Sequence, residues 1–245
     1  FYGGRSQTVQ KKTKVRSRVV AKELVSLMKQ CSNVIVMGHK FADHDCIASS
    51  VAVSRIAKHV GKPVNVVVNI HDFNLKAIFN SMRGQKEYTD LFVDRESAQE
   101  LMRADTLLVV CDVNNVKLFE VPEIYEAASN IVIIDHHRKT SNSIEQTVLS
   151  LHEPSASSAS ELVSELLQYL VETGDILRAE AEALLAGVGG RELQFGFRHL
   201  ASLLGEEEGG YHDNACGDEV EHAGSSAVPG QDFAHLERGG GLSSY

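Results

Sequence analysis

Apolar residues along this chain follow two patterns that alternate from the N-terminal region onward. Short unbroken apolar runs, typical of strands covered on both faces of a sheet, occupy residues 34–38, 63–68, 106–113 and 131–135. Apolar residues at helical intervals predict helices at residues 19–28, 47–60, 75–82, 98–102 and 123–128. Strands that alternate with helices in this way predict an α/β fold, in which a parallel βαβ sheet is flanked by helices.

The pattern changes in the last third of the chain. TVLSL at 147–151 predicts an edge strand, and amphipathic stretches predict helices at 159–172 and 179–186. From Gly187 onward the chain holds thirteen of its 19 glycines, and the apolar periodicity fades. We therefore expect residues 205–245 to be flexible and to lack a core of their own.

Composition and charge narrow the classes of function. The 245 residues carry a formal net charge of −9, which argues against an extended nucleic-acid footprint because such a surface is basic. A basic cluster at 11–18 is interpreted as a solvated linker or a first helical turn. The four cysteines have no metal-site spacing, and no segment approaches the roughly 20 apolar residues of a membrane span. These features predict a cytoplasmic chain without a membrane segment.

Acidic and imidazole side chains stand at the ends of three predicted strands. They are His39, Asp43 and Asp45 after the first strand, Asp112 at the end of the third, and Asp135, His136 and His137 at the end of the fourth. Taken singly, each has an ordinary explanation as a cap, a turn residue or a solvated histidine. In a parallel sheet, however, the carboxyl ends of the strands meet at one rim, so we expect these residues to lie together.

Carboxylates crowded at one rim need a compensating charge, because each raises the cost of ionising its neighbours. A divalent cation supplies that charge, and mixed carboxylate and imidazole ligands without a thiolate suit Mn²⁺, Fe²⁺ or Zn²⁺. Five or six ligands exceed what one ion takes, which indicates two ions bridged by a shared carboxylate. Two ions about 3.5–4 Å apart are the usual arrangement for transfer of a phosphoryl group to water.

The same residues carry a resemblance to a known family. HKFADHD at 39–45, VVCDVNN at 109–115 and DHH at 135–137 resemble the first three motifs of the DHH phosphoesterase superfamily. Two flanking stretches, FYGGRSQTVQKKTKVRSR at 1–18 and EPSASSASELV at 153–163, are similar to those of GdpP-type cyclic-di-AMP phosphodiesterases. The similarity extends from residue 1 to about residue 198, and motifs in this order are highly specific.

The resemblance implies a DHH domain that binds a pair of Mn²⁺ ions and hydrolyses cyclic di-AMP to the linear dinucleotide pApA. The metal ligands that it implies are His39 and Asp43 for one ion, Asp45 and Asp112 for the second ion or the bridge, and His136. It further implies that His137 faces the phosphate and that Asp135 orients a neighbouring histidine. Ser157 and Ser158 are expected to help position the substrate.

The C-terminal part departs from the family pattern. Where the family has a metal-binding Asp after the helix at 180–188, this sequence has Arg191, a fixed cation that repels a metal ion. The family's second domain, DHHA1, is not recognisable. We therefore divide the chain into a linker from a missing N-terminal region (1–18), the DHH domain (19–190) and a divergent tail (191–245). A change of reading frame and a divergent binding protein both fit this tail, and we favour the first.

Three functions are consistent with these observations. The leading prediction is a metal-dependent phosphodiesterase that acts on cyclic di-AMP. One alternative is another nuclease or oligoribonuclease of the superfamily. The other is an inactive nucleotide-binding remnant, and Arg191 is the residue that supports this interpretation. The resemblance also implies a membrane-anchored full-length protein with this domain on the cytoplasmic side, and it is compatible with a homodimer.

Overall fold

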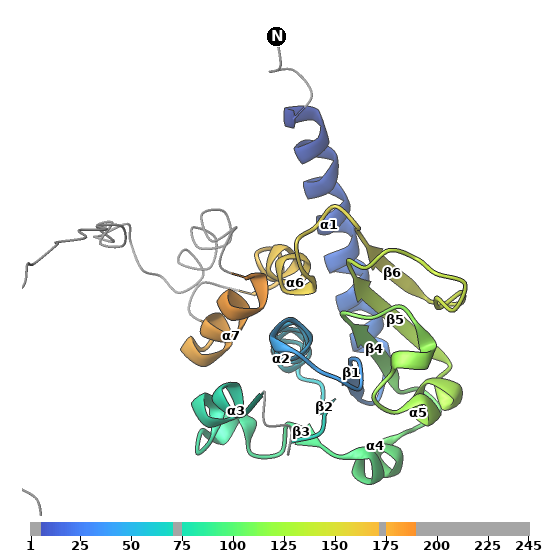
Figure 1. The fold of residues 1–245 in the computed structure, drawn as a ribbon, viewed down its shortest axis with the longest axis vertical. Helices are drawn as coiled ribbons and strands as arrows, with labels where there is room; N and C mark the ends of the chain where they lie inside the picture. The colour runs from blue at the N-terminus through green and yellow to red at the C-terminus, as the bar shows by residue number, and fades with distance from the viewer. Residues whose placement is uncertain (1–5, 71–74, 172–174, 190–245) are drawn as a thin grey trace, which may run out of the picture. The chain divides into compact units, whose positions relative to one another are not determined.

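A single parallel sheet organises the protein. The computed structural model describes residues 6–70, 75–171 and 175–189, with the side chains of residues 6–14 excepted. Within these ranges the strands lie in the order β3 (Phe92–Val93), β2 (Val64–Val67), β1 (Val34–Met37), β4 (Leu107–Cys111), β5 (Asn130–Asp135) and β6 (Leu149–His152). Every neighbouring pair is parallel, so the predicted α/β architecture is confirmed (Figure 1).

Helices cover both faces of the sheet. One face carries α1 (Ser6–Gln30), α2 (His44–His59), α3 (Lys76–Met82), α6 (Ala159–Leu167) and α7 (Arg178–Val188). The other face carries α4 (Arg95–Leu101) and α5 (Pro122–Ala127). Two short 3₁₀ turns lie in the connections, η2 (Lys86–Tyr88) between α3 and β3 and η3 (Val116–Leu118) between β4 and α5. Among the helices of the described residues, none combines the length and the apolar character that a membrane span requires.

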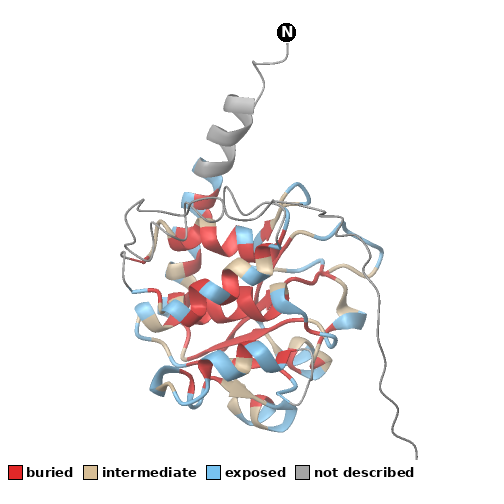
Figure 2. Ribbon diagram, turned by 60° about the vertical axis from the view of Figure 1, so that its left-hand side comes forward, coloured by how far each residue is buried: buried red, intermediate tan, exposed pale blue. Residues whose placement is uncertain are grey.

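The central strands are apolar on both sides because each side faces its own core. In β1, Val34 and Val36 pack into the core beneath α1 and α2, whereas Ile35 and Met37 pack into the core beneath α4 and α5. β4 and β5 alternate between the two cores in the same way. Figure 2 shows the resulting concentration of buried residues on the strands and on the helix faces turned toward them. This arrangement explains the unbroken apolar runs in the sequence.

The order of the strands places a crevice at the middle of the sheet. From β1 the chain moves outward through β2 to β3, then returns to the other side of β1 and moves outward through β4 and β5 to β6. The direction of winding therefore reverses between β1 and β4. In open α/β sheets, ligands bind at the carboxyl ends of the strands beside such a reversal.

Several element boundaries differ from those predicted. The helix predicted at 19–28 extends from Ser6 to Gln30, so residues 6–18 of the predicted linker are helical. The helix predicted at 159–172 ends at Leu167, and the two-residue strand β3 was not predicted because it is too short to form a pattern. The predicted divergent tail at 191–245, including Arg191, lies outside the described residues. The division into linker, domain and tail stays a prediction.

Candidate metal centre

The structure brings the seven strand-end residues into one group at the carboxyl ends of β1, β4 and β5. His39 follows β1, Asp112 follows β4, and Asp135 is the last residue of β5. Contacts shorter than 4 Å link these side chains to one another and to the remaining four members, which are Asp43, Asp45, His136 and His137. The expectation that one rim of the sheet collects these groups therefore holds in the structure.

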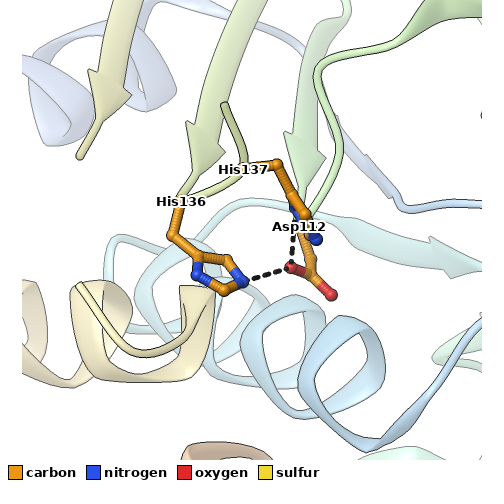
Figure 3. Close-up of side chains that lie close together, drawn as sticks. All are labelled: Asp112, His136 and His137. Atoms are coloured by element: carbon orange, nitrogen blue, oxygen red, sulfur yellow. Dashed lines mark ion pairs between the residues drawn. The ribbon is translucent and has the colours of Figure 1, made fainter. Parts of the chain in front are cut away.

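Asp112 lies at the centre of the group. Its side chain is 2% exposed, and its Oδ2 lies 3.5 Å from Nε2 of His39. Its Oδ1 lies 3.4 Å from Nε2 of His136 and 3.6 Å from Nδ1 of His137 (Figure 3). The two oxygens of one buried carboxylate thus face imidazoles that come from different strands.

The backbone of Asp112 adopts an unusual conformation. Its φ of 58° lies in the left-handed region, and it is the one non-glycine residue in the described ranges with a positive φ. Its amide donates a hydrogen bond to the carbonyl of Ile134 at 2.9 Å, which anchors the turn to β5. Such conformations cost on the order of 1 kcal/mol or more and collect at functional sites. The structure therefore holds this carboxylate in place at an energetic cost.

The loop between β1 and α2 delivers His39 and Asp43. Asp43 caps α2, since its Oδ1 accepts a hydrogen bond from the amide of Cys46 at 3.0 Å. The same oxygen lies 3.9 Å from Nε2 of His39. Gly38 permits this close turn, because a Cβ there would overlap Sγ of Cys46. The short loop thus holds both residues beside Asp112.

Asp45 is held by the start of α6. Its Oδ2 and Oδ1 accept hydrogen bonds from the amides of Ala159 and Ser160 at 2.8 and 2.7 Å. Its Oδ2 also lies 3.7 Å from Nε2 of His136. Burial and the nearby negative charge of Asp112 raise the pKa of Asp45 to about 6, although the amide hydrogen bonds oppose this shift. A carboxylate crowded in this way gains from a neighbouring cation.

Ser157 and Ser158 lie at the start of α6 and make capping interactions. Oγ of Ser158 accepts a hydrogen bond from the amide of Glu161 at 3.0 Å. Ser157 donates from both its amide and its hydroxyl to the carboxylate of Glu161, at 2.7 Å each. Both hydroxyls therefore have structural partners, and their predicted role in positioning substrate stays a prediction.

The DHH loop holds its two imidazoles through different partners. Nδ1 of His136 lies 3.3 Å from the carbonyl of Ala156, which leaves Nε2 facing the carboxylates of Asp45 and Asp112. Nδ1 of His137 lies 2.9 Å from Oδ1 of Asp135, whose side chain is fully buried. Metal-binding histidines commonly donate their second ring N–H to a carbonyl or a carboxylate in this manner. Both contacts therefore fit histidines oriented for a metal centre.

Two further residues of the site were missed by the sequence reasoning. The side-chain amide of Asn114 donates to Oδ2 of Asp135 at 2.5 Å and to the carbonyl of His137 at 3.1 Å. Nε2 of His152, the last residue of β6, lies 2.6 Å from the same carbonyl and 3.7 Å from Oδ2 of Asp135. The available signal was their position, since Asn114 follows Asp112 by two residues and His152 stands at a fourth strand end.

The electrostatics of the group centre on Asp112. Burial alone raises the pKa of this carboxyl group, but the contacts with His136 and His39 outweigh burial and hold the pKa below its ordinary value. The contact with Asp112 raises the pKa of His136 to about 9. Burial opposes a charge on His39, yet Asp112 outweighs it and raises the pKa of that imidazole as well. The histidines thus supply positive charge that a metal ion would replace.

The donor set fits a divalent metal. Two groups of three residues each offer ligand atoms that lie within 4.8 Å of one another. The first group is His39, Asp43 and Asp112, and the second is Asp112, His136 and His137. Asp112 belongs to both groups, and its buried Oδ1 makes no hydrogen bond with any described residue. His136 faces Asp112 with Nε2, whereas the His137 nitrogen nearest Asp112 is Nδ1, which already contacts Asp135, so His136 is the better-placed ligand of the second group. Carboxylate and imidazole donors without thiolate suit Mn²⁺, Fe²⁺ or Zn²⁺.

Comparison with known proteins supports the predicted family. The chain is 35% identical over 190 residues to the cyclic-di-AMP phosphodiesterase GdpP of Bacillus subtilis (strain 168), covering 77% of this chain and 29% of that protein. The same figures apply to the cyclic-di-AMP phosphodiesterase PdeA of Listeria monocytogenes serotype 1/2a (strain 10403S). The chain thus spans less than a third of the length of these relatives.

A solved structure and a family model complete the comparison. An exopolyphosphatase-related protein from Bacteroides fragilis superposes with a TM-score of 0.58 at 19% identity, over 76% of this chain and 56% of that chain, which shows a shared fold. Residues 33–188 match the model of the DHH family, N-terminal domain. Because this match covers more than half of the chain, the protein belongs to the DHH family.

Proposed function

We propose that this chain is the DHH domain of a metal-dependent phosphodiesterase that hydrolyses cyclic di-AMP to pApA. The observation that carries the proposal is the position of Asp112, whose buried carboxylate belongs to both groups of metal-ligand atoms. A carboxylate shared in this way is what a pair of ions needs as a bridge. The substrate is proposed because two relatives at 35% identity are named cyclic-di-AMP phosphodiesterases.

The residues that would hold two Mn²⁺ ions divide about Asp112. His39 and Asp43 would hold one ion, Asp45 and His136 would hold the other, and Asp112, whose carboxylate lies beside both histidines, would complete the set. Bound ions of this kind lower the pKa of a water molecule and neutralise charge on the phosphate. The choice of Mn²⁺ over Fe²⁺ or Zn²⁺ rests on the resemblance to the family.

His137 is proposed to act on the phosphate. Asp135 accepts a hydrogen bond from Nδ1–H of His137, which leaves Nε2 as the nitrogen available to a ligand. The His137 side chain is 55% exposed, so a substrate can reach it, while the buried carboxylate beside it keeps the ring in one orientation. Asn114 and His152 hold the backbone carbonyl of the same histidine. The loop therefore presents one imidazole in a defined tautomer at the rim.

Two further expectations about the whole protein remain proposals. We propose that the domain belongs to a membrane-anchored protein and faces the cytoplasm, as the resemblance implies. A relative from Onion yellows phytoplasma (strain OY-M), 28% identical over 193 residues, is named a membrane protein-large ribosomal subunit bL9 fusion protein. That name supports the proposed membrane anchor. A homodimer stays a prediction that gel filtration with light scattering would test.

The proposed activity is tested with the purified chain, Mn²⁺ and cyclic di-AMP, with products separated by anion exchange. We expect pApA to form, to disappear with EDTA and to return with added Mn²⁺. The variant Arg191→Asp is assayed in parallel and is expected to turn over faster, because it restores the acidic residue of the family pattern. Preferential hydrolysis of pApA or single-stranded DNA would favour another activity of the superfamily. Absence of product from both chains with Mn²⁺ bound would contradict the proposal.

A further inference from the structure

Phe41 is an apolar ring held in solvent beside the metal centre. Phe41 is 72% exposed, the largest exposed fraction among the large hydrophobic residues of the described ranges. It lies two residues from His39 and two residues from Asp43. Two residues of extended chain span at most about 7 Å, so the Phe41 backbone lies within that distance of both proposed ligands.

The exposure of Phe41 is not the result of a loose loop. The amide of Lys40 donates to the carbonyl of Leu118 at 2.8 Å, and the amide of Glu120 donates to the carbonyl of Gly38 at 3.1 Å. An antiparallel bridge pairs His39 with Phe119 between these two bonds. On the far side of Phe41, the loop enters the capped first turn of α2. The ring is therefore presented from a backbone that is anchored on both sides.

A cation accompanies the exposed ring. Nζ of Lys40 lies 5.2 Å from the centroid of the Phe41 ring, which is within the range of a cation–π contact. The positive charge of Lys40 matches the phosphates of a dinucleotide. An exposed aromatic face beside it matches a nucleobase, because bases of any sequence stack on aromatic side chains. The pair thus offers the two chemistries of a nucleotide on adjacent residues.

We infer that Phe41 and Lys40 form a stacking platform for one adenine of the substrate, with Phe41 contacting the base and Lys40 the adjoining phosphate. The inference rests on the function proposed above and adds a binding site for the base to it. It commits to a nucleobase because the ring adjoins the proposed metal ligands His39 and Asp43 and has the cation of Lys40 beside it. If a second protein domain or a second copy of the chain covers this ring instead, the tryptophan fluorescence of Phe41→Trp will reveal it.

The first test places a fluorescent reporter on the platform. The chain contains no tryptophan, so Phe41→Trp creates a single-tryptophan protein. Titration with pApA, the proposed product, in the presence of Mn²⁺ is expected to quench this tryptophan as a base stacks on it. The matched control is Val148→Trp, since Val148 is 42% exposed and precedes β6 at the opposite end of the sheet. Its fluorescence is expected to stay unchanged.

The second test asks whether an aromatic ring is required. Phe41→Leu keeps an apolar side chain, whereas Phe41→Tyr keeps the ring. Loss of one stacked base is expected to weaken pApA binding about tenfold in Phe41→Leu, measured by calorimetry, while Phe41→Tyr stays within about twofold of the wild type. Equal binding by both variants, or a fluorescence signal of Phe41→Trp that pApA does not change, would overturn the inference.

Failure of the platform and failure of the proposed function are distinguishable. If the wild-type chain forms and binds pApA while Phe41→Leu behaves like it, the function stands and the platform does not. If neither the wild type nor Arg191→Asp binds pApA or hydrolyses cyclic di-AMP, both are wrong. A tryptophan emission of Phe41→Trp that is already blue-shifted without ligand, and that responds to protein concentration instead of pApA, would show that protein covers the ring and would also overturn the inference.

Discussion

Two clusters of buried charge in this protein are built in opposite ways. Between α2 and α7, Glu180 is 1% exposed and receives Arg55 in a two-pronged contact, with Nη2 at 2.7 Å from Oε1 and Nε at 2.9 Å from Oε2. The amide of Leu177 donates to the same carboxylate at 3.0 Å. At the strand ends, Asp112 is equally buried, but its Oδ1 has no hydrogen-bond donor among the described residues.

The difference separates a structural cluster from a ligand site. For Glu180 the chain supplies both the cation and the remaining donor, so the charge is balanced when the protein folds. Around Asp112 the chain supplies further carboxylates and imidazoles, and it places Asp112 in a left-handed conformation. A buried charge is tolerated only when it is paired or bound to a metal. The strand-end cluster therefore fits a divalent cation, which would replace the positive charge that His39 and His136 supply to Asp112 in its absence.

The largest expected effect is that of Asp112→Asn. The substitution keeps the shape of the side chain and removes the charge that both groups of ligands share, so the two-ion site should be lost. We expect hydrolysis of cyclic di-AMP to fall on the order of 10³-fold or more, since bound metal supplies several kcal/mol of transition-state stabilisation. Rates measured with saturating Mn²⁺ test this expectation. Activity within tenfold of the wild type would contradict the central position of Asp112.

Glu180→Gln should lower the stability of the fold and leave the metal site intact, the opposite of Asp112→Asn. Removing one partner of a buried ion pair leaves Arg55 uncompensated and is expected to reduce the free energy of unfolding by about 3–5 kcal/mol. Urea denaturation measures the loss, and the fraction that remains folded is expected to keep its metal. Arg55→Met combined with Glu180→Leu should recover most of the stability, because neither charge is then left buried. A stability equal to the wild type in Glu180→Gln would show that the pair is not balanced as described.

Asn114→Ala tests the support behind the DHH loop. Its amide group holds Asp135 and the carbonyl of His137, so its loss should free the imidazole that we propose faces the substrate. Substitution of residues that orient ligands typically lowers metal affinity or activity 10–100-fold. The neighbouring Asn115 is a matched control, since its side chain contacts the amide of Lys117 instead. Comparable losses in Asn114→Ala and Asn115→Ala would indicate a general effect on folding.

The smallest predicted effect concerns pH in the metal-free chain. The pKa of His136 is about 9 in the folded protein and near 6.5 when unfolded, so its contact with Asp112 stabilises the fold fully below pH 6.5. This stabilisation should be lost as the pH rises through 9. Allowing for partial exposure, we expect a loss of about 1 kcal/mol between pH 7 and 9.5, measured by urea denaturation in EDTA. His136→Asn should lack this component of the pH dependence.

Much of the site follows from local patterns in the sequence. β1, β4 and β5 each lie between two cores, so their sequences are continuous apolar runs. These runs made both the strands and their ends recognisable in the sequence. Once a parallel sheet is expected, the meeting of His39, Asp112 and His136 at one rim follows from its geometry. The prediction that these residues approach one another needed no knowledge of side-chain contacts.

The parts that escaped prediction depend on tertiary pairing. His152 reaches the DHH loop because β6 pairs with β5 in a register that sets Asp135 opposite it, and nothing local to TVLSL specifies that register. Asn114 reads as an ordinary turn residue until the fold brings the buried Asp135 beside it. The exposure of Phe41 likewise depends on hydrogen bonds between its loop and residues 118–120. Contacts between distant segments, which decide these three cases, leave little trace in the sequence.

The most direct test of the central claim is the number of Mn²⁺ ions bound per chain, measured by equilibrium dialysis and elemental analysis. The shared carboxylate of Asp112 predicts two ions in the wild type and at most one in Asp112→Asn. Glu180→Gln, assayed where it is folded, should bind two. Two ions in Asp112→Asn, or none in the wild type, would contradict the claim that Asp112 bridges a pair of metals at the strand ends.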